Sequence, residues 1–141
     1  MSRSILPMLL LLFLAASCGK GELDPATLTN NPFDADYNGP TVYEVDTTYQ
    51  QIITGGSAPV VYQVIAFRVK EELFLGAAAY FVQVFDPGNG LTSLLSPNPA
   101  NSDHFTYSRL GATVGIPVCL DLRLFNDQSA ARAEEICATL Q

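Results

Sequence analysis

A strict alternation of apolar and polar residues near the C-terminus constrains the fold of this chain most strongly. In the segment 118–125, the apolar residues Val118, Leu120, Leu122 and Leu124 occupy every second position. Successive side chains of an extended strand point to opposite sides, so this spacing places all four on one face. The sequence therefore predicts a strand with one buried face, and burial of that face needs a second layer.

Further strands are predicted upstream and downstream, each bounded by glycine, proline, asparagine or serine. They span residues 42–49, 60–69, 78–85, 91–95, 104–110 and 132–140, with 96–102 as a loop and 70–75 as a strand end and loop. Short strands at regular spacing with turn signals between them favour two packed sheets. We therefore predict an all-β domain, an antiparallel β-sandwich, over residues 41–141.

The N-terminal residues 1–17 have the character of an export signal. Arg3 supplies one positive charge, and residues 5–16 are apolar over a length too short for a membrane-spanning helix. The signal ends in a string that resembles the lipobox of bacterial lipoproteins, Leu14-Ala15-Ala16-Ser17-Cys18, with its leucine one place earlier than usual. The resemblance implies cleavage before Cys18, lipidation of its thiol and acylation of the new N-terminus. The alternative is an ordinary secretory signal followed by a chance cysteine.

The lipoprotein resemblance also implies a location. Gly19 follows the cysteine, where an aspartate would retain some lipoproteins in the inner membrane, so the outer membrane is favoured, on either of its faces. Several acyl chains anchor a protein firmly, because each buried methylene contributes about 0.8 kcal/mol. Residues 18–40 are expected to form the lipidated N-terminus and a tether, since they are rich in glycine, asparagine and proline.

The charge balance narrows the choice of partner. The chain has 7 basic and 14 acidic residues, and removal of Arg3 with the signal changes the net charge from −7 to −8. A net-acidic surface without a basic run argues against nucleic acid and against anionic headgroups as partners. A protein or a glycan of the cell envelope is the expected partner.

Two cysteines remain once Cys18 is used for lipid. If the lipoprotein resemblance holds, Cys119 and Cys137 reach an oxidising compartment in which thiols pair, so we expect a disulfide between them. If they face each other across an antiparallel hairpin, its turn centres on Gln128 and both sulfurs lie on the outer side. The alternative is a zinc site that includes His104, which lacks a fourth ligand and any CxxC spacing.

The C-terminal region carries a second resemblance. An alternating strand around an arginine occupies residues 118–127, a final strand ending in threonine occupies 135–139, and Leu110 and Gly115 precede both. This pattern resembles the last two strands of fibronectin type III domains of secreted bacterial proteins. It implies a fibronectin type III-like or immunoglobulin-like sandwich. The family's early tryptophan and its tyrosine of the penultimate strand are absent, and Phe67 is expected to fill the tryptophan position.

A candidate calcium loop lies in the expected tether. The residues from Asp34 onward have the D-x-D-x-N-G opening of such loops, in which alternate oxygen ligands surround a hard cation. Asp34, Asp36 and Asn38 are therefore candidate calcium ligands. The twelfth position is Val45, where a bidentate glutamate is required, so an acidic, turn-forming tether is the alternative.

Catalytic residues do not form a recognisable set, and we expect a protein that is not an enzyme. His104 is the only histidine, and no G-x-S-x-G motif accompanies it. Glu71 and Glu72 are adjacent, so on a strand their carboxylates would point to opposite faces. No glycine-rich phosphate loop is present in the sequence.

Aromatic side chains are the remaining candidates for binding. A platform for a sugar or a peptide would use Tyr43, Tyr49, Tyr62, Phe81 and Phe85. In the strand 78–85, Phe81 and Phe85 lie opposite Tyr80, so one of the two sets faces outward. The alternative is a core packed from both sheets.

Overall fold

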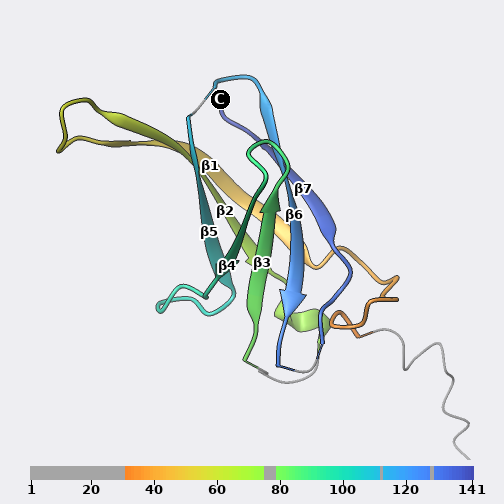
Figure 1. The fold of residues 1–141 in the computed structure, drawn as a ribbon. Helices are drawn as coiled ribbons and strands as arrows, with labels where there is room; N and C mark the ends of the chain where they lie inside the picture. The colour runs from red at the N-terminus through yellow and green to blue at the C-terminus, as the bar shows by residue number, and fades with distance from the viewer. Residues whose placement is uncertain (1–30, 75–78, 112, 128) are drawn as a thin grey trace, which may run out of the picture.

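Two antiparallel sheets pack face to face in the computed structural model of this protein (Figure 1). The structure describes residues 31–74, 79–111, 113–127 and 129–141. The predicted signal, Cys18 and the first part of the expected tether lie outside the described residues.

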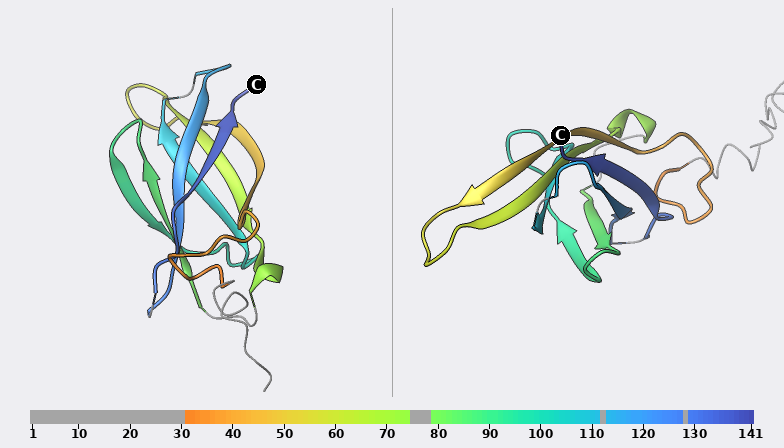
Figure 2. Two further views of the ribbon diagram at one scale, coloured as in Figure 1. Left: turned by 90° about the vertical axis from the view of Figure 1, so that its right-hand side faces the viewer. Right: turned by 90° about the horizontal axis from the view of Figure 1, so that it is seen from above.

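The described residues form seven strands and one 3₁₀ turn. These are β1 (Tyr43–Ile53), β2 (Val60–Val69), η1 (Glu71–Leu73), β3 (Phe81–Asp86), β4 (Leu91–Leu95), β5 (His104–Leu110), β6 (Pro117–Phe125) and β7 (Glu134–Thr139). One sheet has the order β1-β2-β5 and the other β4-β3-β6-β7, with every neighbouring pair antiparallel. The two layers are seen side by side in Figure 2. The predicted antiparallel β-sandwich is confirmed.

The alternation patterns locate most strand ends well. The strands predicted at 60–69, 91–95 and 104–110 are confirmed at both ends as β2, β4 and β5. β1 continues to Ile53, beyond the predicted end at Tyr49, while β3 begins at Phe81. Ala78, the predicted start of the third strand, lies outside the described residues.

The core lies between the two sheets. On β6 the residues Leu120, Leu122 and Leu124 are each at most 1% exposed, as the alternation predicts. From the opposite sheet, the rings of Phe67 and Phe105 stack with centroids 5.8 Å apart. Phe67 is fully buried, in keeping with its expected place in the core.

The β6–β7 hairpin has the predicted register. Cys119 pairs with Cys137 and Leu120 pairs with Ile136. Nearer the tip, Phe125 bridges Ala130, so the pairing there is shifted by one residue. Gln128, the predicted centre of the turn, lies outside the described residues.

The prediction for 70–75 is wrong in part, because Glu71–Leu73 forms the turn η1 instead of a loop. Leu73 N donates to Lys70 O at 3.0 Å and Phe74 N donates to Glu71 O at 3.2 Å. The turn brings the Phe74 ring to within 5.2 Å of the Phe33 ring, measured between centroids. This tertiary contact decides the local conformation, and no alternation pattern reports it.

The expectation that the tether extends to residue 40 is also wrong. Phe33 and Tyr37 are 6% and 3% exposed and belong to the hydrophobic core. The Tyr37 hydroxyl donates to Pro40 O at 2.9 Å, which closes the turn over the domain. The packed unit therefore begins at least as early as Phe33, because two aromatic rings supply apolar area that the polar composition of this stretch conceals.

Candidate functional site

The β1–β2 hairpin projects beyond the body of the sandwich as a two-stranded arm, which we define as residues 49–62 (Figure 1). β2 pairs with β5 only from Gln63 to Arg68, so beyond Gln63 the two strands of the arm pair with each other. At the inner end of the arm, Gly111 N donates to Val61 O at 2.9 Å. A two-stranded ribbon is marginally stable by itself in water. The arm is thus a segment that a further contact would stabilise.

Polar side chains fix the base of the arm. The Thr48 hydroxyl donates to Val64 O at 3.0 Å, and Gln63 Nε2 donates to Thr48 Oγ1 at 3.4 Å. Gln63 is only 1% exposed although it is polar. These bonds join β1 to β2 at the point where the arm leaves the sandwich, so they help to set its direction.

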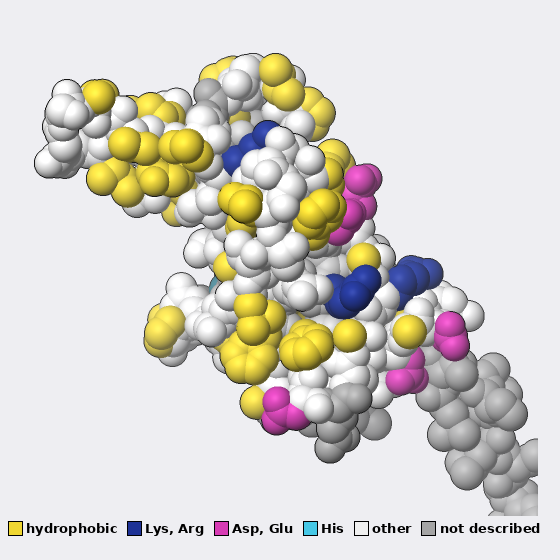
Figure 3. Space-filling model, in the orientation of Figure 1, with side chains coloured by type: hydrophobic (Ala, Val, Ile, Leu, Met, Phe, Trp, Pro, Cys, Tyr) yellow, Lys and Arg dark blue, Asp and Glu magenta, His cyan; other side chains and the backbone are white. Residues whose placement is uncertain are grey.

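Apolar side chains are exposed on both faces of the arm. Tyr49 is 47% exposed, Ile52 is 55% exposed and Ile53 is 51% exposed. Ile52 and Ile53 are consecutive residues of a strand, so they point to opposite faces. Figure 3 shows hydrophobic side chains gathered on the projecting hairpin, with no acidic or basic side chain coloured on the visible face of it.

The sequence holds a signal for the arm, although alternation alone does not report it. Between Asp46 and Arg68 the chain carries no charged residue. Exposed strand edges usually carry charges, prolines or bulges that prevent unwanted pairing. A long uncharged stretch that the structure leaves exposed therefore marks the arm as a candidate contact surface.

The aromatic residues proposed as one platform are divided among different surfaces. Tyr43 is buried in the core, whereas Tyr49 and the half-buried Tyr62 belong to the arm. Phe81 and Phe85 lie on the outer face of the larger sheet, and Phe85 is 39% exposed. A single platform formed from all five is wrong, because the register places them on separate faces.

The outer face of the larger sheet has a shallow hollow of about 270 Å³ next to Phe85. Gln83, Asp121 and Arg123 line it together with Thr92. An exposed ring beside amide, carboxylate and guanidinium groups is a second candidate contact surface.

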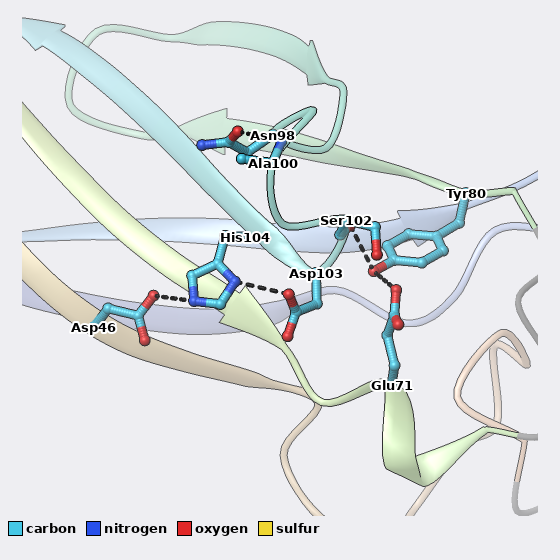
Figure 4. Close-up of polar contacts among 8 residues, drawn as sticks. All are labelled: Asp46, Glu71, Tyr80, Asn98, Ala100, Ser102, Asp103 and His104. Atoms are coloured by element: carbon cyan, nitrogen blue, oxygen red, sulfur yellow. Dashed lines mark hydrogen bonds and ion pairs between the residues drawn. The ribbon is translucent and has the colours of Figure 1, made fainter.

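His104 lies between two carboxylates on the outer side of the smaller sheet (Figure 4). His104 Nδ1 donates to Asp103 Oδ1 at 2.7 Å, and His104 Nε2 is 3.6 Å from Asp46 Oδ2. Asp46 sits at a register shift in β1 between Val45 and Thr47, and such a bulge redirects a side chain. The hydrogen bond from His104 holds the pKa of Asp103 below its usual value. The His104 ring is thus held by Asp103 on one side and lies near Asp46 on the other.

Glu71 contacts the core instead of pairing with Glu72 in an acidic site. The Tyr80 hydroxyl donates to Glu71 Oε1 at 2.6 Å, as Figure 4 shows. Burial and this bond to a carboxylate raise the pKa of Tyr80 above its ordinary value. The pair holds η1 against β3, which is a structural role.

Asp86, at the end of β3, is a fully buried acid. Its Oδ1 accepts from Gly88 N at 2.8 Å, its Oδ2 accepts from the Tyr107 hydroxyl at 3.2 Å, and Arg109 Nε lies 3.6 Å from Oδ2. The carboxylate is fully buried and is fully used in bracing the β3–β4 turn against β5. The only sequence signal for this role is the placement of an aspartate before Pro87-Gly88.

The candidate calcium ligands lie on a turn at the domain surface. Asp36 and Asn38 are exposed and Asp34 is half-buried, whereas Phe33, just before Asp34, and Tyr37 are buried in the core. Asp34 O accepts from Tyr37 N at 3.2 Å, a bond within the turn. The turn is therefore stabilised by its aromatic residues, and calcium binding stays a prediction.

Cys119 and Cys137 form a disulfide across β6 and β7, with Cα atoms 4.0 Å apart. Both lie on the outer side, opposite the buried leucines, as predicted. Among the described residues, the one group of three potential metal ligands consists of these two cysteines and Glu135. Since the disulfide uses both sulfurs, a zinc site with His104 does not form here.

Comparison with protein-family models, with curated proteins and with solved structures finds no match to this chain. In the part of the chain that the structure describes, no helix has the length and apolar character needed to cross a membrane.

Proposed function

We propose that this chain is a lipid-anchored lipoprotein of the bacterial outer membrane that acts as a non-catalytic binding module, and that its arm contacts a protein partner. The observation that carries the proposal is the arm itself. It is uncharged, projects from the sandwich, and exposes apolar side chains on both faces. Contiguous exposed apolar surface on a soluble domain is typical of an interaction site.

The lipid anchor is proposed from the lipobox-like string that ends at Cys18. The first described residues lie at the end of the domain remote from the tip of the arm (Figure 1). A chain held through Cys18 would therefore present the arm away from its own attachment point. The disulfide between Cys119 and Cys137 supports an oxidising compartment.

A binding role without catalysis is favoured by the contacts that the side chains of His104 and Asp86 make. His104 has carboxylates at both ring nitrogens, and the buried carboxylate of Asp86 is used in a turn. Two of the residues considered for acid–base chemistry, His104 and Glu71, thus have structural partners.

The strand order supports a proposal about domain type. In constant-type immunoglobulin domains the fourth strand pairs beside the fifth. Here β4 pairs with β3, in the larger sheet. We therefore favour the fibronectin type III-like form of the predicted resemblance over the constant immunoglobulin form.

A protein partner is favoured over a glycan at the arm, because a strand edge offers backbone donors and acceptors that another strand can pair with. Glycan binding is a second candidate, at the hollow beside Phe85, where a ring adjoins Gln83, Asp121 and Arg123. If glycans bind there, Phe85→Ala retards the chain less on an affinity gel of envelope polysaccharide, and Ile52→Lys does not. Equal retardation of wild type and Phe85→Ala removes this candidate.

Anchoring is tested by metabolic labelling of the full chain with palmitate in a bacterial host. We expect label in the wild-type chain and none in Cys18→Ala, which should also leave the membrane fraction. Label retained in Cys18→Ala contradicts the anchor.

Binding through the arm is tested with a photo-crosslinking amino acid at position 53 of the full chain in intact cells. The matched control is position 94 on β4, because Leu94 is 56% exposed and Ile53 is 51% exposed, and both lie on edge strands. We expect a discrete protein adduct from position 53 and none from position 94. Adducts of equal yield from both positions, or from neither, contradict the proposal.

A further inference from the structure

The outer edge of the arm is an unprotected strand edge. β1 lies at the edge of its sheet and pairs with β2 alone. The part of β1 near Val45 to Thr48 lies beside β7, while residues 49–53 extend beyond the sandwich. The bulge at Asp46 falls before this stretch, and β1 contains no proline. The usual devices that prevent edge pairing are thus absent from residues 49–53.

The stretch also pairs well with itself. If two antiparallel copies meet with Gln51 on a two-fold axis, Tyr49 of one copy faces Ile53 of the other, and Gln50 faces Ile52. Aromatic and β-branched residues are favourable cross-strand neighbours. A register centred on Tyr49 would instead set Asp46 against Ile52, and one centred on Ile53 would run into the loop at Gly55. A register centred on Gln50 also keeps to uncharged residues, but it sets Tyr49 against Gln51 and Ile52 against Thr48. The register at Gln51 is preferred because it pairs Tyr49 with Ile53 within the uncharged strand.

Charge favours this edge for contact between two copies. The full sequence has a net charge of −7, which becomes −8 when the signal is removed, so copies repel each other where carboxylates meet. The edge strand β7 carries Glu134 and Glu135, whereas no charged residue lies between Asp46 and Arg68. Two acidic copies can approach along the arm without opposing like charges.

We propose that the arm's occupant is a second copy of this chain, joined by antiparallel pairing of the two β1 edges about Gln51. The inference rests on the proposed function in taking the arm as the contact surface. A short strand pair buries less than the roughly 1,200–2,000 Å² of a standard stable interface, so the dimer is a reversible one.

The test is disulfide trapping of the full chain in the envelope of producing cells. Gln51→Cys places two thiols in directly opposed positions, with Cβ atoms roughly 5 Å apart. Gln50→Cys, one residue away on the same strand, would leave its two thiols on diagonal positions beyond the reach of a disulfide. We expect a reducible dimer from Gln51→Cys, joined at position 51 in peptide mapping, and monomer from Gln50→Cys.

A second measurement does not depend on oxidation, and it decides the question if Gln51→Cys forms disulfides poorly. Sedimentation of the detergent-solubilised full chain should show concentration-dependent dimer for wild type and for Leu94→Lys, and monomer for Ile52→Lys. Equal trapping of Gln50→Cys and Gln51→Cys, or dimer retained in Ile52→Lys, overturns the register and the edge contact. If Gln51→Cys stays monomeric while position 53 still crosslinks to a different protein, the second copy is the wrong occupant and the proposed function stands.

Discussion

Removal of the disulfide should lower the stability of the domain by an amount that the loop length sets. Cys119 and Cys137 are separated by 18 positions in sequence. The chain-entropy relation gives about 3 kcal/mol for a loop of this size. Cys137 is exposed and Cys119 is half-buried on the outer face, so replacing both with alanine leaves little cavity. Nearly all of the cost should therefore come from the greater freedom of the unfolded chain.

Urea unfolding followed by tyrosine fluorescence measures this cost. With a slope of about 1.5 kcal/mol per molar, the midpoint of Cys119→Ala/Cys137→Ala should fall by about 2 M. Wild type reduced with dithiothreitol is the matched control and should show the same midpoint as the double variant. A fall in the urea midpoint of less than about 0.5 M would refute the reasoning. A difference between the midpoints of the double variant and of reduced wild type would also refute it.

Three further predictions concern the core residue Leu122, the buried Asp86, and the stability of the fold at low pH. Leu122→Ala should cost about 2–5 kcal/mol in urea unfolding, since Leu122 is fully buried, and a cost below about 1 kcal/mol contradicts its place in the core. Asp86→Ala should cost about 3 kcal/mol and Tyr107→Phe about 1 kcal/mol, because the first leaves several buried donors without an acceptor. Equal losses of unfolding free energy in Asp86→Ala and Tyr107→Phe would contradict the role of Asp86 as the shared acceptor. The pKa of Asp103 is lowered from 3.8 in the folded state by His104, so the bond stabilises the fold above about pH 4 and is lost as pH falls through the lowered value. Unfolding curves of wild type and Asp103→Asn should therefore converge in acid, and a gap that widens there contradicts the bond.

Much of the sandwich follows from local patterns. The alternating leucines of β6 fix its inner face, and the opposed cysteines fix the register of the last hairpin. These features are predictable because strand periodicity and cross-strand pairing depend on residues near each other in sequence or joined by a covalent bond.

Features decided by distant contacts are not predictable in this way. Phe33 and Tyr37 look like parts of a polar tether until Phe74 is seen to pack on the first of them. The turn η1 depends on the same contact and on the bond from Tyr80 to Glu71. Both need a partner that lies far away along the chain.

The arm belongs to the same category. Its strands show ordinary alternation, and the sequence does not say where β5 stops pairing with β2. Its lack of charge is visible in the sequence, but this becomes informative only when the structure leaves Ile52 and Ile53 exposed.

The most direct test of the arm as a contact between two copies of this chain is amide hydrogen exchange of the full chain at rising protein concentration. Pairing of two β1 edges predicts that those amides of residues 49–53 that point away from β2 become protected as concentration rises, while the amides of β4 keep a constant rate. Exchange in residues 49–53 that does not change with concentration, or protection that grows equally in β4, would contradict it.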